Sequence, residues 1–139
     1  MRITQTKYYI EITKLVAKRS PCLSRQVGAV ITKNDRIIST GYNGPLSKFP
    51  HCTKCKRKES GKDLENCPAL HAEVNALMYA SDKGDTIYCT TRPCINCLKL
   101  IIASGIKNII YLEKYLSTEV RKELISQGNI NERQYTYFN

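Results

Sequence analysis

The chain has 139 residues, of which 42% are hydrophobic and 24% charged, proportions typical of one globular domain with a single core. The sequence contains no run of about 18 apolar residues that would predict a membrane span, and its first residues do not resemble a secretory signal peptide. The formal net charge of +10 favours an acidic partner, a nucleotide or a nucleic acid, although a solvated lysine-rich surface explains it equally well.

The seven cysteines indicate metal binding rather than disulfides. We expect a cytoplasmic protein (in the host cytoplasm if its origin is viral), and thiols stay reduced in that compartment. The odd number of cysteines also argues against a fully paired disulfide framework.

The first half of the chain predicts a helix, a hairpin and a long loop. Apolar residues recur at helical spacing over residues 7–18, and Ser20-Pro21 should end that helix. Residues 26–32 and 36–42 are predicted strands joined by a turn at residues 33–35. Residues 43–67 carry few large apolar side chains but three cysteines and a histidine, so a metal could replace a hydrophobic core there.

In the second half, helices alternate with strands. The predicted helices span residues 69–81, 94–104 and 118–127, the last two ended by Gly105 and Gly128. The predicted strands span residues 86–90 and 108–112, with a final edge strand over residues 134–138. This alternation predicts an α/β sandwich whose sheet is at least partly parallel.

The residues that carry chemistry begin two of the predicted helices. His71 and Glu73 lie near the start of one, and Pro93, Cys94 and Cys97 at the start of the next. Imidazole and thiolates are zinc ligands, and a catalytic zinc keeps its fourth position for water. A helix N-terminus lowers the pKa of nearby thiols, and residues three apart on a helix share a face.

Glu73 would then be the acid and base beside a zinc held by His71, Cys94 and Cys97. H-x-E followed by P-C-x-x-C is the signature of zinc-dependent nucleobase deaminases. Either half alone would be weak: a lone His-Ala-Glu is usually helix surface, and a lone Cys-x-x-Cys could be a redox pair or half of a structural zinc site.

On these residues the chain resembles the deoxycytidylate deaminases of the cytidine deaminase superfamily, over about residues 8–115. The similar segments are Val27-Gly28-Ala29-Val30-Ile31, Gly41-Tyr42-Asn43-Gly44, His71-Ala72-Glu73-Val74-Asn75-Ala76, Pro93-Cys94-Ile95-Asn96-Cys97 and Ser104-Gly105-Ile106-Lys107. Riboflavin-pathway deaminases space their two cysteines further apart, and transfer-RNA adenosine deaminases usually lack the Gly-Tyr-Asn-Gly element.

The resemblance implies a three-layer α/β/α sandwich with a mixed five-stranded sheet. It also implies one deaminase domain over residues 1–139, with a cysteine-rich, zinc-binding insertion at about residues 43–68. The implied activity is zinc-dependent hydrolytic deamination of dCMP to dUMP and ammonia, which supplies dUMP for thymidylate synthesis. In that chemistry Glu73 moves the protons.

The resemblance further suggests which residues contact the substrate. Asn43 would contact the sugar and the backbone at Ala72 the base, while Arg25 and Tyr115 are candidates for phosphate or base contacts. Arg25 could instead be a surface charge before a strand, and Tyr115 a packed loop residue.

A second zinc is expected near the long loop. Cys52 and Cys55 have zinc-knuckle spacing, and many family members carry a structural zinc in this insertion. Cys22 and Cys67 would complete a closed four-thiolate site, with His51 as an alternative ligand. Cys89 is predicted to be a small buried apolar residue.

Other interpretations stay open. Some family members are hexamers regulated by dCTP and dTTP, so a homo-oligomer (a hexamer or smaller multimer) and allosteric control are expected by analogy. The substrate could instead be dCTP, or a base in RNA or DNA. The basic side chains of the loop favour a nucleic acid, but they lack interleaved aromatic residues for base stacking; they are Lys54, Lys56, Arg57, Lys58 and Lys62. The remote alternative is a non-catalytic zinc module built on Cys52, Cys55, Cys94 and Cys97.

Overall fold

The computed structural model describes residues 1–57 and 62–137. Its centre is a five-stranded sheet in the order β2-β1-β5-β6-β7. These strands are β1 (Gly28–Lys33), β2 (Arg36–Tyr42), β5 (Thr86–Thr91), β6 (Asn108–Glu113) and β7 (Asn131–Gln134). β1 is antiparallel to β2 and to β5, whereas β5, β6 and β7 are parallel to one another. The mixed five-stranded sheet is therefore confirmed.

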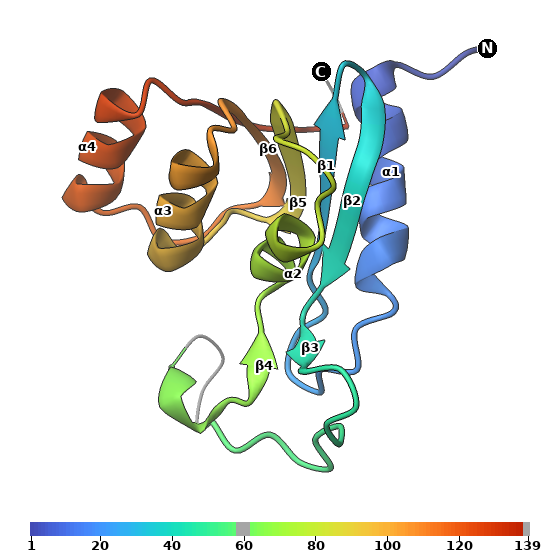
Figure 1. Cartoon of the computed structure of the whole chain (residues 1–139), viewed down its shortest axis with the longest axis vertical. Helices are drawn as coiled ribbons and strands as arrows, with labels where there is room; N and C mark the ends of the chain where they lie inside the picture. The colour runs from blue at the N-terminus through green and yellow to red at the C-terminus, as the bar shows by residue number, and fades with distance from the viewer. Residues whose placement is uncertain (58–61, 138–139) are drawn as a thin grey trace.

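Helices cover both faces of the sheet, which confirms the three layers (Figure 1). α1 (Gln5–Ala17) lies on one face, and α2 (Ala72–Met78), α3 (Ile95–Ser104) and α4 (Glu119–Gln127) lie on the other. Because successive strand side chains point to opposite faces, Val30 packs with Ile10 of α1, while Ile31 belongs to the core shared with α2 and α3.

Two glycines of the β1–β2 hairpin let a helix lie close against each face. A Cβ on Gly28 would lie 2.5 Å from the Thr13 carbonyl oxygen of α1. A Cβ on Gly41 would lie 2.4 Å from the Ala72 carbonyl oxygen of α2. Ser39 also donates a hydrogen bond to the Ala76 carbonyl at 2.6 Å, so α2 is fixed closely on β2.

The helix predicted over residues 69–81 is shorter than expected. Ala69–Leu70 form a short strand, β4, that pairs with β3 (Gly44–Pro45). A 3₁₀ turn, η1 (Leu64–Asn66), precedes it. The pairing holds the backbone extended up to His71, so α2 begins at Ala72, and it ends at Met78.

The prediction of a last strand over residues 134–138 is wrong. The strand is Asn131–Gln134, parallel to β6; residues 135–137 are not a strand and Phe138 lies outside the described residues. The segment is polar, but its Glu132 carboxylate is only 3% exposed because it pairs with two arginines. Tertiary ion pairing therefore outweighs the aromatic pattern of residues 135–138.

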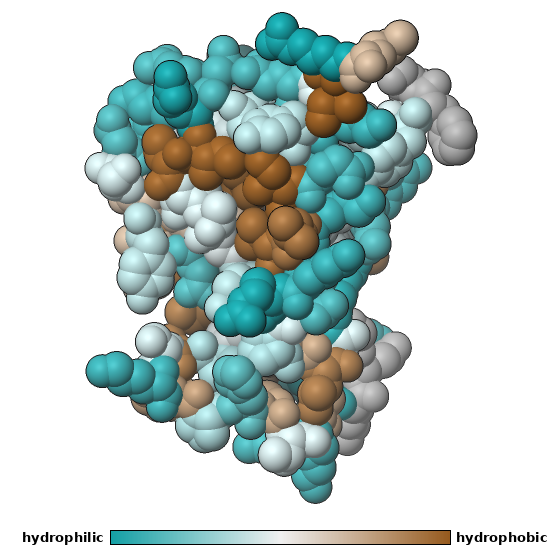
Figure 2. Space-filling model, turned by 90° about the vertical axis from the view of Figure 1, so that its right-hand side faces the viewer, coloured by the Kyte–Doolittle hydropathy of each residue, from teal (hydrophilic) through white to brown (hydrophobic). Residues whose placement is uncertain are grey.

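Within the described residues, no helix is long and apolar enough to cross a membrane. Apolar side chains form a band across the upper part of the face that carries α1, and smaller apolar patches lie below it (Figure 2). Leu15 of α1 is 66% exposed, so the described residues leave this side chain largely open to solvent.

Candidate metal centre and active-site cleft

Two helix starts bring the chemical groups together. His71 is the N-cap of α2, with an extended backbone at φ −70° and ψ 153°. Cys94 is the N-cap of α3, and Cys97 lies in the first turn of that helix. α2 and α3 lie beside each other on the same face of the sheet (Figure 1). The N-terminal ends of the two helices therefore lie close together.

The three predicted ligands converge at distances that suit zinc. His71 Nδ1 lies 3.5 Å from Cys94 Sγ and 3.3 Å from Cys97 Sγ. All three ligand atoms lie within 4.8 Å of one another. Bond lengths of about 2.3 Å to sulfur and 2.0 Å to nitrogen would place a nitrogen–sulfur pair of a tetrahedral site about 3.5 Å apart, so the donor set fits the ion.

Hydrogen bonding between the two thiols polarises the pair. Donation from Cys97 is the main effect that lowers the pKa of Cys94 to about 4, whereas the same contact raises the pKa of Cys97 well above its usual value. The Cys94 thiolate in turn raises the pKa of His71. The cluster thus holds negative charge and a shared proton that a divalent cation would displace.

Glu73 lies beside this cluster and is only 4% exposed. Burial raises the pKa of its carboxyl, and the contact with the Cys97 thiol opposes that rise. A carboxyl whose pKa is raised in this way accepts and releases a proton more readily than an exposed one, as an acid–base residue must.

A cleft of ≈ 120 Å³ joins these groups to the predicted substrate contacts. Arg25, Asn43, Ala72 and Tyr115 all line it together with Glu73. The structure therefore brings together every residue expected there.

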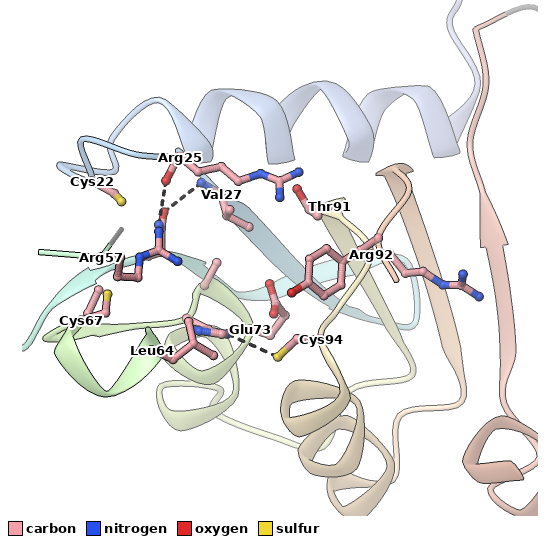
Figure 3. A pocket seen from close by; sticks show the side chains of 15 residues that line it. Cys22, Arg25, Val27, Arg57, Leu64, Cys67, Glu73, Thr91, Arg92 and Cys94 are labelled. Carbon is pink, nitrogen blue, oxygen red and sulfur yellow. Dashed lines mark hydrogen bonds between the residues drawn. The ribbon is translucent and has the colours of Figure 1, made fainter. Parts of the chain in front are cut away.

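The Asn43 side chain is engaged with the chain entering β1. Its Oδ1 accepts from the Val27 N–H and its Nδ2 donates to the Arg25 carbonyl, both at 2.8 Å (Figure 3). The Arg25 guanidinium pairs with Glu113 at 2.8 Å at the surface. Both residues thus have a structural contact besides any role toward a ligand.

The sequence did not single out two arginines that line the cleft as site residues. Arg57 comes from the cysteine-rich loop, and its buried Nε has no hydrogen-bond partner among the residues described. Arg92 lines the cleft with its stem, while its guanidinium points away and pairs with Glu132 (Figure 3). Only spatial proximity reveals either residue, since neither belongs to a motif.

Residues 3–113 match the sequence profile of the family described as "Cytidine and deoxycytidylate deaminase zinc-binding region". The chain belongs to the cytidine and deoxycytidylate deaminase family. Its zinc-binding character is thereby shared with the family, and the His71–Cys94–Cys97 cluster is the group that fits the ion.

Named members of the deaminase family resemble the chain closely. A deoxycytidylate deaminase of Saccharomyces cerevisiae is 34% identical over 145 residues, covering 99% of this chain and 46% of that protein. The chain thus spans less than half the length of the yeast protein. A deoxycytidylate deaminase of Mycobacterium phage D29 is 38% identical, over 76% of this chain and 91% of the phage protein.

A solved deaminase structure shares the fold over nearly the whole chain. It is the dCMP deaminase of cyanophage S-TIM5 in complex with dCMP and dUMP, with a TM-score of 0.79 and 27% identity. The alignment covers 97% of this chain and 99% of the cyanophage chain.

Cys22, Cys52, Cys55 and Cys67 all line a second, smaller cavity beside the cleft that contains Glu73. They come from the segment after α1 and from both sides of the cysteine-rich loop. Among residues 1–57 and 62–137, the group whose ligand atoms converge within 4.8 Å is that of His71, Cys94 and Cys97. His51 is exposed and does not line this cavity. Cys89 is fully buried in β5, as predicted.

Proposed function

We propose that this protein hydrolyses dCMP to dUMP and ammonia and so supplies dUMP for thymidylate synthesis. The observation that carries the proposal is the buried Glu73 carboxyl beside the converging His71, Cys94 and Cys97, at one end of a cleft lined by arginines. The similarity to a dCMP deaminase solved with dCMP and dUMP supports the choice of substrate.

The proton transfers belong to Glu73. His71, Cys94 and Cys97 would hold the zinc, which would supply a water whose pKa is lowered toward neutrality. Glu73 would take one proton from the attacking water as the water oxygen bonds to C4, and would deliver that proton to N3 of the pyrimidine. Glu73 would then take the second proton of the water from the oxygen on C4 and deliver it to the departing amine, so the C4–N bond breaks, C4 becomes a carbonyl and ammonia leaves.

The remaining cleft residues would bind the nucleotide. The Ala72 backbone would contact the base, and Tyr115 the base or the phosphate; both residues line the cleft. An amide nitrogen carries two hydrogens, so Asn43 can donate to a sugar hydroxyl as well as to Arg25. Arg25 is the proposed phosphate ligand: its half-exposed pair with Glu113 costs only about 1 kcal/mol or less to break. Arg57 is a second cation available to the phosphate.

A comparison of substrates tests the assignment. The zinc-loaded protein should deaminate dCMP with a higher kcat/KM than deoxycytidine, dCTP or a cytosine in single-stranded RNA. A higher kcat/KM for dCTP would instead identify the triphosphate as the substrate. Tight, salt-sensitive binding of RNA with deamination of the polymer would favour the nucleic-acid alternative.

We also propose that Cys22, Cys52, Cys55 and Cys67 hold a second, structural zinc. Their shared cavity supports this, because four thiolates around one zinc ion would form a closed site that folds the long loop. The fully loaded protein should contain two zinc ions per chain, and Cys52→Ser/Cys55→Ser should contain one. One zinc in both proteins would contradict the second site. Retention of fold, catalytic zinc and turnover by the double variant would also exclude a zinc module shared between these cysteines and Cys94 and Cys97.

The organisation around this chemistry is proposed by analogy. We take residues 1–139 as one deaminase domain, with the insertion at about 43–68 of which residues 58–61, including Lys58, lie outside the described residues. Exposed apolar side chains such as Leu15, Met78 and Tyr79 support self-association, which light scattering would measure. Regulation by dCTP and dTTP would appear as changed dCMP saturation curves, and a cytoplasmic location is expected with a nucleotide substrate.

A further inference from the structure

We propose that Arg121 and Glu132, on α4 and β7, are positioning residues for the zinc ligand Cys94. Arg121 Nη1 donates a hydrogen bond of 2.5 Å to the carbonyl of Pro93, the residue directly before Cys94. Both residues lie beyond the 3–113 segment that matches the family. The support for the metal centre would thus come from the last two elements of the described chain.

A buried carboxylate, that of Glu132, connects Arg121 to Arg92, the residue directly before Pro93. Glu132 accepts from Arg121 Nη2, and it accepts from Arg92 Nε at 2.9 Å and Nη2 at 2.6 Å. The side chains of Arg121 and Glu132 are 2% and 3% exposed, and that of Arg92 is 20% exposed. The Glu132 carboxylate therefore binds the Arg92 side chain directly, and it holds the Arg121 side chain that contacts the Pro93 carbonyl.

Pro93 transmits the contact to the ligand. The peptide between Pro93 and Cys94 is planar and rigid. A guanidinium that fixes the Pro93 carbonyl therefore also fixes the backbone nitrogen and Cα of Cys94. Cys94 has an extended N-cap backbone at φ −66° and ψ 169°. The direction of its Cα–Cβ bond depends on that backbone, and its Sγ must stay close to His71 Nδ1.

Stability alone is a weak reason for such a network. Buried ion pairs are often no more stabilising than apolar side chains of the same volume. The buried Arg121 Nε also lacks a hydrogen-bond partner among the described residues, which lowers the free energy of unfolding. What the network provides that apolar packing cannot is a directional bond to one carbonyl.

Metal affinity tests the inference, with Co²⁺ as a visible stand-in for zinc. The part of the Co²⁺ thiolate absorption that is lost in Cys94→Ala reports this site alone, whatever other cysteines bind. Arg121→Met should weaken metal binding at this site by about 10- to 100-fold and change its Co²⁺ bands. Arg121→Lys and Glu132→Gln should show smaller changes in the same direction, and they carry the test if Arg121→Met does not fold.

Ile130→Ala is the matched control, because Ile130 is buried directly before β7 and lies outside the network. It should lower Tm while leaving metal affinity within about twofold of the unaltered protein. Unchanged affinity and spectrum in the network variants, or an equal loss of affinity in Ile130→Ala, would overturn the inference. The inference rests on the proposed zinc site. If the unaltered protein shows no Cys94-dependent Co²⁺ band, both the zinc site and the positioning role are overturned. Unchanged affinity in the network variants, or an equal loss in Ile130→Ala, overturns the positioning role alone.

Discussion

Gly41→Ala should damage the active site through the position of α2. The new Cβ would lie 2.4 Å from the Ala72 carbonyl oxygen and 2.5 Å from the Ala76 nitrogen, whereas real Cβ contacts are essentially never below 3.0 Å. The helix must therefore move away from β2 by about 0.6 Å or more, the difference between 3.0 and 2.4 Å. His71 and Glu73 move with α2, because they lie at its start.

Both stability and turnover should fall. Overpacking costs about 1–3 kcal/mol, which corresponds to a drop in Tm of about 4–12 °C for a chain of this size. The shift weakens the Ser39 hydrogen bond to α2 and displaces Glu73 relative to Cys94 and Cys97. Displacements of this order reduce turnover by about 10- to 100-fold.

Gly28→Ala provides the matched comparison on the opposite face. Its Cβ would meet the Thr13 oxygen at 2.5 Å and the Ala17 nitrogen at 2.7 Å, a similar clash against α1, which carries no site residue. Thermal melts and dCMP kinetics of both variants should show similar losses of Tm but a much larger loss of kcat in Gly41→Ala. Normal kcat in a folded Gly41→Ala, or equal losses of kcat in both, would refute the reasoning.

Three further perturbations test other contacts. Arg25→Ala should raise the KM for dCMP about 10-fold or more and that for deoxycytidine much less; equal increases would exclude a phosphate contact. Burial raises the pKa of Tyr88 to about 12, above the value near 10 of an unfolded chain. The folded state therefore favours the neutral phenol, and the contribution of Tyr88 to the free energy of unfolding is fully present below pH 10 and is lost as pH rises through 12. Tyr88→Phe should therefore make the fall of Tm between pH 10 and 12 shallower. An unchanged slope of Tm against pH would contradict the raised pKa of Tyr88. Removing zinc with a chelator should abolish dCMP turnover reversibly, whereas turnover that survives complete removal would exclude zinc from the chemistry.

The sequence predicted best what local pattern and motif chemistry determine. The β1–β2 hairpin, α3 with its Gly105 cap and the convergence of His71, Cys94 and Cys97 follow from periodicity, turn residues and ligand spacing. Zinc ligands on two helix starts require those helices to lie side by side, so the motif also constrained the packing.

The errors arose where distant residues decide the structure. The pairing of Gly44–Pro45 with Ala69–Leu70 shortens α2, and no local signal marks it. Glu132 in β7 is stabilised by Arg92 and Arg121 from other elements, so its polar segment did not resemble a strand. Arg57 lines the cleft although it lies on the cysteine-rich loop, away from any motif.

The most direct test of the proposed chemistry compares the unaltered protein with Glu73→Gln, each analysed for zinc and then mixed with dCMP. The account predicts that the unaltered protein releases dUMP and ammonia in equal amounts. Glu73→Gln should retain its zinc and lose turnover by at least about 10²-fold, because the amide cannot carry the proton. No dUMP from the zinc-loaded protein, even with added dCTP, or normal turnover by Glu73→Gln, would contradict it.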